Sequence, residues 1–174
     1  MQLGFGLLKA GYEPTLYSDM TAAQIYDSPA RPVTIQFGKS VSFEDELELR
    51  FWQHSRYSEI QDAYFTVYSP AGEELMTING EFEKAAQCID LRMKFAKWLE
   101  EFEARDGRVV IEKCDTDSIE RMAAENDLVL VAAGRGQFME MFEKDESKME
   151  FSEPQRQVAM FYTQGCDLHR QLED

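Results

Sequence analysis

Small residues and glycines end an apolar run in the stretch Asp127-Leu-Val-Leu-Val-Ala-Ala-Gly-Arg-Gly136. We predict a buried parallel strand here, because consecutive Leu and Val residues indicate a sheet that is covered on both faces. Ligands of such sheets bind beyond the carboxyl ends of the strands, so Gly134 and Gly136 are candidates for close backbone contact with a cofactor. An ordinary strand followed by a glycine turn explains the same residues.

Asp19 is a second candidate, because it follows a short predicted strand at Thr15–Ser18 and a predicted helix over residues 1–10. An acid in this position could bind a ribose hydroxyl of a dinucleotide. The alternative is an aspartate that forms a turn. Gly4 and Gly6 do not form a phosphate-binding turn, because no strand precedes them, and we expect them to let the helix pack closely on a sheet.

The sequence lacks the residue spacing that a metal site or a catalytic triad needs. The cysteines lie far apart in the sequence, and neither histidine has a second metal ligand nearby. These residues are Cys88, Cys114, Cys166, His54 and His169. We therefore predict no metal site and no Ser-His-Asp triad, with cysteines that pack in a reducing compartment.

Composition favours a globular protein with a small-molecule ligand. The chain has 174 residues with 44% hydrophobic and 12% aromatic content, which suits one domain of ordinary size or slightly more. Its 18 Lys and Arg residues against 33 Asp and Glu residues give a net charge of −15, which repels nucleic acids and anionic membranes. We find neither a long apolar run nor a signal-peptide pattern, so we expect a cytoplasmic protein.

The predicted elements around these candidates follow the order of an α/β protein. A strand over residues 108–113 and a helix over 117–125 precede the apolar run, which makes a strand-helix-strand crossover. A long helix over 90–105 begins at Asp90, whose side chain can cap it. Residues 43–52 show a further helical spacing of apolar side chains.

An antiparallel hairpin is predicted in the middle of the chain, with strands over residues 64–68 and 74–78 and a turn at 69–72. We predict another strand over 157–162. The hairpin could form a small second sheet that walls a pocket. Aromatic candidates for that pocket are Trp52, Tyr64, Phe65, Tyr68 and Phe82. Aromatic residues that simply fill a core are the alternative.

Several separated motifs carry a family resemblance. They are Gly6-Leu-Leu-Lys-Ala-Gly-Tyr-Glu13, Leu16-Tyr-Ser-Asp19, Gln87-Cys-Ile-Asp-Leu-Arg-Met-Lys94, Trp98-Leu-Glu-Glu-Phe-Glu103, Asp127 to Gly136, and Phe142-Glu-Lys144 followed by Pro154-Gln-Arg156. In this order they resemble the oxygenase components of styrene and indole monooxygenases, over roughly residues 2–165.

The resemblance implies an α/β fold with a partial Rossmann-like FAD-binding sheet of the hydroxybenzoate-hydroxylase-like type and a small antiparallel substrate-domain sheet. Residues 1–53 and 86–150 would form the FAD-binding part, and 54–85 and 151–174 the substrate-binding β region. It also implies that a peroxyflavin inserts one oxygen atom into an aromatic alkene or indole. Reduced FAD would come from a separate NADH-dependent flavin reductase. No catalytic side chain is predicted, because the cofactor carries the chemistry.

Two other readings stay open. The chain could be a non-catalytic domain that binds aromatic ligands, or its sheet edge could be covered by a partner chain or by self-association as a homodimer.

The resemblance also assigns site residues. Arg31 and Arg92 match family arginines beside the flavin, and Gly134 matches the small-residue end of the strand beside the cofactor. A guanidinium suits a diphosphate because it can bond bidentately and keeps its charge. Together with Asp19 these form the predicted FAD contacts, although an Asp90–Arg92 pair at the helix start or a solvent-facing side chain would also explain Arg92. Tyr64, Phe65 and Tyr68 are the predicted substrate contacts.

The sequence also departs from the family pattern. The first strand and the GxGxxG turn, which cradle the pyrophosphate in the family, would precede Met1. Residues 32–36 differ from the polar residues that we would expect near the flavin ring. We therefore expect only part of a cofactor site within these residues.

Overall fold

The computed structural model describes residues 1–29, 33–53, 59–132, 138, 143 and 145–151. The chain divides into two compact units, residues 1–130 and 131–174. The described part of the second unit contains one short 3-10 helix, η2 (Glu146–Lys148), which begins where the Asp145 side chain accepts a hydrogen bond from Ser147 N. The other elements named below all belong to the first unit.

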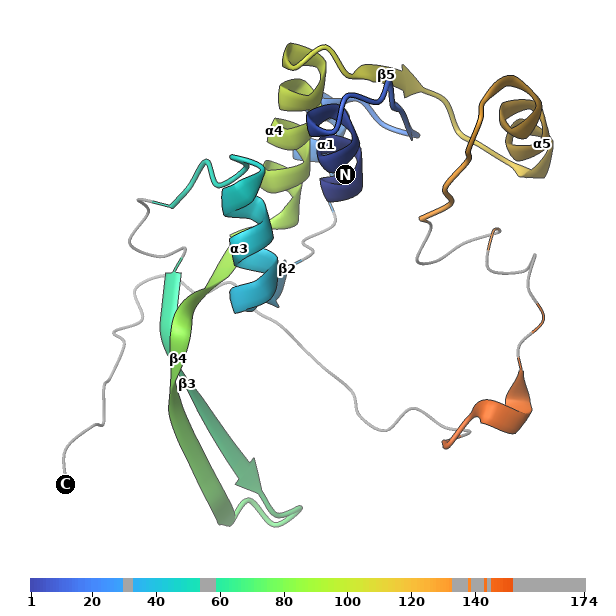
Figure 1. Ribbon diagram of the computed structural model, residues 1–174. Coiled ribbons are helices and arrows are strands. Elements are labelled where there is room, and N and C mark those ends of the chain that lie inside the picture. Colours follow the sequence, from blue (N-terminus) through green and yellow to red (C-terminus); the bar gives the residue numbers. More distant parts are fainter. Residues whose placement is uncertain (30–32, 54–58, 133–137, 139–142, 144, 152–174) are drawn as a thin grey trace. The chain divides into compact units, whose positions relative to one another are not determined.

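A two-stranded parallel sheet joins β1 (Thr15–Ser18) to β5 (Arg108–Ile111). Helix α1 (Gln2–Lys9) precedes β1, and α5 (Thr116–Glu125) follows β5 (Figure 1). Asp115 caps α5, because its side chain accepts a hydrogen bond from Ser118 N. These four elements confirm the predictions from local sequence signals.

The parallel strand predicted from residue 127 is wrong for the residues that the structure describes. Residues 127–132 form no strand, and Leu128, Leu130 and Val131 are 71%, 55% and 49% exposed. A strand forms only where a neighbouring strand accepts its backbone hydrogen bonds, and in the described chain β1 and β5 pair only with each other. Gly134 and Gly136 lie outside the described residues.

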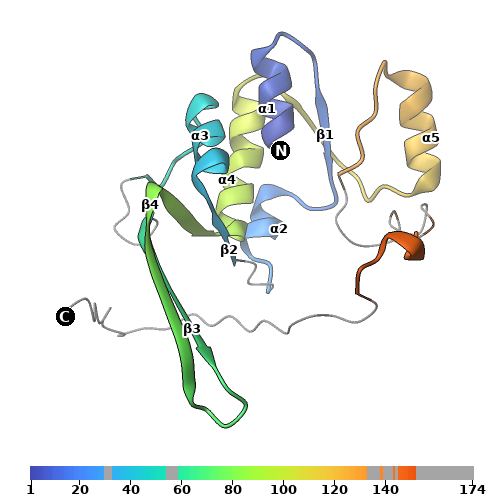
Figure 2. The ribbon, with the colours of Figure 1, turned by 60° about the horizontal axis from the view of Figure 1, so that its bottom comes forward.

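An antiparallel sheet has the strand order β2-β4-β3, formed by β2 (Val33–Gln36), β4 (Glu74–Asp90) and β3 (Glu59–Tyr68). The hairpin of β3 and β4 is confirmed and is longer than predicted. It turns at Ser69, whose Oγ accepts hydrogen bonds from two backbone N–H groups of the turn. Figure 2 shows that this hairpin continues beyond β2 as a two-stranded ribbon. With both sheets, the chain is a mixed α/β protein.

Three further helices complete the first unit: α2 (Ala22–Tyr26), α3 (Gly38–Glu46) and α4 (Leu91–Ala104). Helix α4 confirms the prediction, including its cap by Asp90, whose side chain accepts a hydrogen bond from Arg92 N. The helix expected over residues 43–52 starts earlier and stops at residue 46. It ends because Glu48 adopts a left-handed conformation, with φ of 56°.

The core lies where α1 and α4 meet. Phe5, Trp98 and Phe102 pack there with edge-to-face ring contacts, and Leu47 and Leu49 complete the cluster. A Cβ added to Gly4 would lie 3.0 Å from the Phe102 ring. The expectation that this glycine lets α1 approach a sheet is therefore wrong, since the close neighbour is a helix.

Within the described chain, no helix combines the length and apolarity needed to cross a bilayer. The same residues hold no group of three metal-ligating side chains. Cys88 and Cys114 are free thiols, and burial raises the pKa of each above its ordinary value.

Candidate functional site

Asp19 lies directly after β1, at the carboxyl end of the parallel sheet. Its side chain is exposed. The preceding Ser18 shapes the turn, because its Oγ donates to Met20 O and accepts from Met20 N. The structure therefore places Asp19 where sheets of this kind present ligand-binding side chains.

Arg92 lies at the start of α4, where its guanidinium bonds to a carboxylate of the same helix end. Nε and Nη2 donate to both carboxylate oxygens of Asp90, with Nη2 at 2.6 Å from Oδ2. Nη1 donates to the backbone oxygen of Ser28 at 3.1 Å. The geometry is that of the helix-end pair, and it ties α4 to the end of α2. Arg31 and Gly134 lie outside the described residues.

The three predicted substrate contacts of the hairpin do not point to one place. Successive side chains of a strand alternate between its faces, so Tyr64 and Tyr68 share one face and Phe65 lies on the other. On the Phe65 face, Phe65 stands opposite Ile78 and Val67 opposite Met76, which makes an exposed apolar surface. A single ligand on one face of the ribbon therefore contacts the two tyrosines or the phenylalanine.

An open cleft of about 1100 Å³ lies between β2, the start of α3 and the middle of β4. Phenylalanine rings form much of its wall: Phe37 and Phe82 contact each other, with ring centroids 5.5 Å apart, and Phe43 lines the same cleft. Lys39 and Lys84 add positive charge. The cleft can accommodate a planar aromatic molecule with a polar end.

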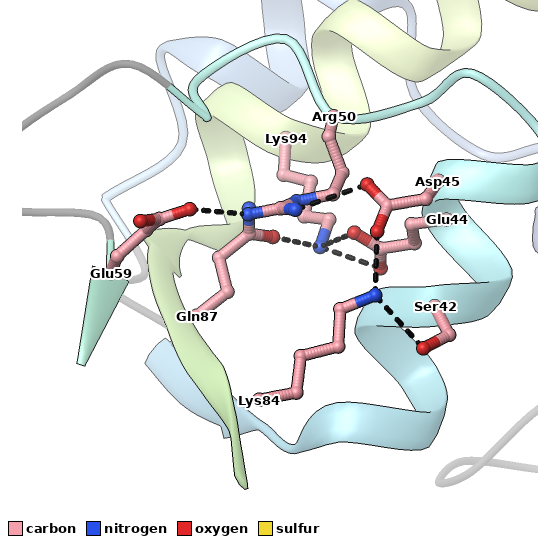
Figure 3. Close-up of polar contacts among 8 residues, drawn as sticks. All are labelled: Ser42, Glu44, Asp45, Arg50, Glu59, Lys84, Gln87 and Lys94. Atoms are coloured by element: carbon pink, nitrogen blue, oxygen red, sulfur yellow. Dashed lines mark hydrogen bonds and ion pairs between the residues drawn. The ribbon is translucent and has the colours of Figure 1, made fainter. Parts of the chain in front are cut away.

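A buried ion pair lies next to the cleft (Figure 3). Lys94 of α4 is 1% exposed, and its Nζ donates to both carboxylate oxygens of Glu44 at 2.7 Å. Gln36 lines the cleft and bonds to both partners, accepting from Lys94 and donating to Glu44. Two more glutamines bond to the pair: Gln87 of β4 accepts a hydrogen bond from Lys94, and Gln2 of α1 donates one to Glu44. One buried pair thus connects α1, β2, α3, β4 and α4.

A second group of charges surrounds this pair (Figure 3). Arg50 donates to Asp45 at 3.0 Å and to Glu59 at 2.7 Å, and Lys84 donates to the other oxygen of Asp45 and to Ser42. Asp45 accepts from both cations and Arg50 donates to both carboxylates, so the two positive charges balance the two negative charges. This arrangement fixes the base of the hairpin against α3.

The pKa values follow from these contacts. Burial lowers the pKa of Lys94, against the opposing effect of its hydrogen bond to Glu44. For Asp45, partial burial raises the pKa, but hydrogen bonds from Lys84 and Arg50 outweigh burial and leave it below its ordinary value. Asp45 therefore stays ionised at neutral pH.

Sequence reasoning missed the buried pair, although one signal was present. Lys94 follows Leu91 by three residues and precedes Trp98 by four, so it lies on the apolar face of α4. A lysine in that position needs a carboxylate partner. Glu44 carried no comparable signal, because it belongs to an acidic stretch in which any residue could face solvent.

Comparison with known proteins shows a similarity to styrene monooxygenases. Residues 134–174 match the model described as "Styrene monooxygenase A putative substrate binding domain". Two relatives are named styrene monooxygenase StyA. The protein of Pseudomonas fluorescens is 21% identical over 165 residues, which cover 95% of this chain and 39% of the relative. That of Pseudomonas sp is 20% identical over the same shares.

The chain thus spans well under half the length of the relatives it matches. Both the whole-chain similarity and the matched domain point to the same family, which confirms the resemblance read from the motifs. The chain is therefore similar to styrene monooxygenases over most of its length.

Proposed function

We propose that this chain forms part of an FAD-dependent monooxygenase that transfers one oxygen atom to an aromatic alkene or an indole. The observation that carries the proposal is the similarity to styrene monooxygenases over 95% of the chain. The cleft walled by phenylalanines supports an aromatic substrate. Bound FAD would supply the oxygen-transfer chemistry, after reduction by a separate NADH-dependent reductase.

In this proposal the chain's own residues bind and orient the cofactor. Asp19 fits a ribose contact, because it is exposed beyond the carboxyl end of a parallel strand. Arg92 fits a diphosphate only if the phosphate replaces Asp90, which holds the guanidinium bidentately. Arg31 and Gly134 are proposed as further contacts. Residues 1–53 and 86–150 would then form the FAD side of a Rossmann-like fold.

A flavin titration tests the cofactor assignment. We expect this chain to bind FAD with a micromolar dissociation constant, measured by the change in flavin absorbance on binding. Asp19→Asn should weaken binding about tenfold, because the hydrogen bond to a ribose hydroxyl loses the charge of its acceptor. Asp117→Asn removes an exposed acid elsewhere and should leave binding unchanged. A folded chain that binds no FAD would contradict the cofactor assignment.

A second function is favoured by the cleft itself: an aromatic-ligand-binding domain without redox chemistry. The cleft is formed by described residues of β2, α3 and β4, so it does not depend on a cofactor. Isothermal titration with indole, in the absence of flavin, separates the two functions. Indole binding by a chain that leaves FAD absorbance unchanged would favour the binding domain.

A further inference from the structure

One end of the cleft brings aromatic rings and lysine side chains together. The Phe37 and Phe82 rings lie 5.5 Å apart with planes inclined by 59°, and Phe37 is 56% exposed. Immediately beside them, Gly38 and Lys84 are in contact, since a Cβ placed on Gly38 would lie 3.5 Å from Cβ of Lys84. Lys39 is the next residue of the chain. Lys39 and Lys84 therefore line the same cleft as the two rings.

Two carboxylate residues, Glu46 and Glu83, also line the cleft. Glu83 is exposed between two half-buried neighbours, Phe82 and Lys84, so its side chain points to the opposite face of β4. Glu46 lies seven residues after Lys39, about 10 Å along α3. Among the residues that the structure describes, none forms an ion pair with Lys39.

Lys84 contributes less charge than Lys39, because it is already bonded. Its Nζ donates to Asp45 at 2.7 Å and to Ser42 at 2.9 Å. Asp45 also accepts from Arg50, so Lys84 is only partly neutralised. A carboxylate entering here gains attraction from Lys39 first and from Lys84 second.

We propose that this end of the cleft binds an aromatic carboxylate, with its ring against Phe37 and Phe82 and its carboxylate at Lys39. The inference rests on the proposed function for its role in catalysis, because it makes the aromatic substrate one that carries an acid group. Binding itself requires no flavin. The site can therefore fail while the cofactor assignment holds, and the reverse is also true.

The test compares indole-3-acetate with indole-3-acetamide, which has the same ring and no charge, by isothermal titration of the flavin-free chain. The acid should bind about fivefold more tightly than the amide, as expected for one exposed ion pair. Lys39→Gln should remove most of this preference and leave only the smaller contribution of Lys84. Lys113→Gln removes the same charge from an exposed position outside the cleft and should preserve the preference.

A second variant tests the aromatic wall. Phe82→Leu should weaken acid and amide to the same extent, because the ring packing is shared by both ligands. Circular dichroism confirms that each variant is folded. Equal affinity of the original chain for acid and amide, a preference that Lys39→Gln leaves undiminished, or no binding of either ligand would each overturn the proposal.

Discussion

The helices around α4 and the ribbon of β3 and β4 are built from similar side chains but bury them very differently. Phe102 of α4 is fully buried and Leu99 is 2% exposed, whereas Phe65 and Ile78 of the ribbon are 69% and 55% exposed. Among the strands that the structure describes, the ribbon pairs only with itself beyond β2. A two-stranded ribbon of this kind gains little stability from its own contacts.

The difference in burial indicates that the two regions have different roles. The helical region holds the stability of the unit, because its side chains are removed from water and its charges are paired. The ribbon and the cleft at its base leave apolar side chains exposed. Substitutions should therefore affect the free energy of unfolding in the first region and binding in the second.

The largest effect is expected at the buried ion pair. Lys94→Met leaves the Glu44 carboxylate buried without its cation, and should lower the free energy of unfolding in urea by about 3–5 kcal/mol. Lys94→Met combined with Glu44→Leu removes both charges and should recover most of the loss. If the single variant were as stable as the original chain, the pair would not hold the five elements together.

Phenylalanine truncation compares the two regions directly. Phe102→Ala should cost about 3–5 kcal/mol of unfolding free energy, because it opens a cavity in the core. Phe65→Ala should change it by less than about 0.5 kcal/mol, because the ring is already exposed. Urea denaturation of both variants measures the contrast. Equal losses would show that the ribbon is packed in solution.

Glycine substitutions sharpen the same contrast at the backbone. A Cβ on Gly107 would lie 2.4 Å from the Phe102 ring and 2.7 Å from its carbonyl oxygen, so Gly107→Ala should destabilise by about 1–3 kcal/mol. A Cβ on Gly80 of the ribbon meets no described atom within 4 Å. Gly80→Ala should leave the midpoint of thermal unfolding unchanged or slightly higher.

The smallest effect concerns pH. The pKa of Asp45 is lowered in the folded chain, so its contribution is fully present above the ordinary value of 3.8 and disappears as pH falls through the folded value. Because the side chain is 38% exposed, the contribution is at most about 1 kcal/mol. Asp45→Asn should flatten the acid side of the stability curve, measured by urea unfolding between pH 5 and pH 2.5.

Local signals in the sequence predicted the elements that depend on local chemistry. The Asp90 cap placed α4, and the Ser69 turn placed the hairpin. The strand expected from residue 127 failed because its formation depends on a neighbouring strand. The buried pair was also out of reach, since Glu44 and Lys94 lie 50 residues apart and only the folded chain brings them together.

The candidate site was predicted only in part. Asp19 could be placed at a strand end because β1 was recognisable from sequence. The cleft combines Phe37, the residue between β2 and α3, with Phe82 of β4, and the two rings meet only because β2 pairs with β4. No periodicity in the sequence contains that register, so the lysines beside the rings could not be grouped in advance.

The position of Lys94 also makes the fluorescence of Trp98 sensitive to the charge of the buried lysine. Its ammonium group lies 4.8 Å from the centre of the Trp98 ring, whose Nε1 donates to the Leu49 carbonyl. Indole emission depends on nearby charge, and the chain has only one other tryptophan, Trp52. With Trp52 replaced by phenylalanine, the emission wavelength would report the ionisation of the buried lysine without any added label.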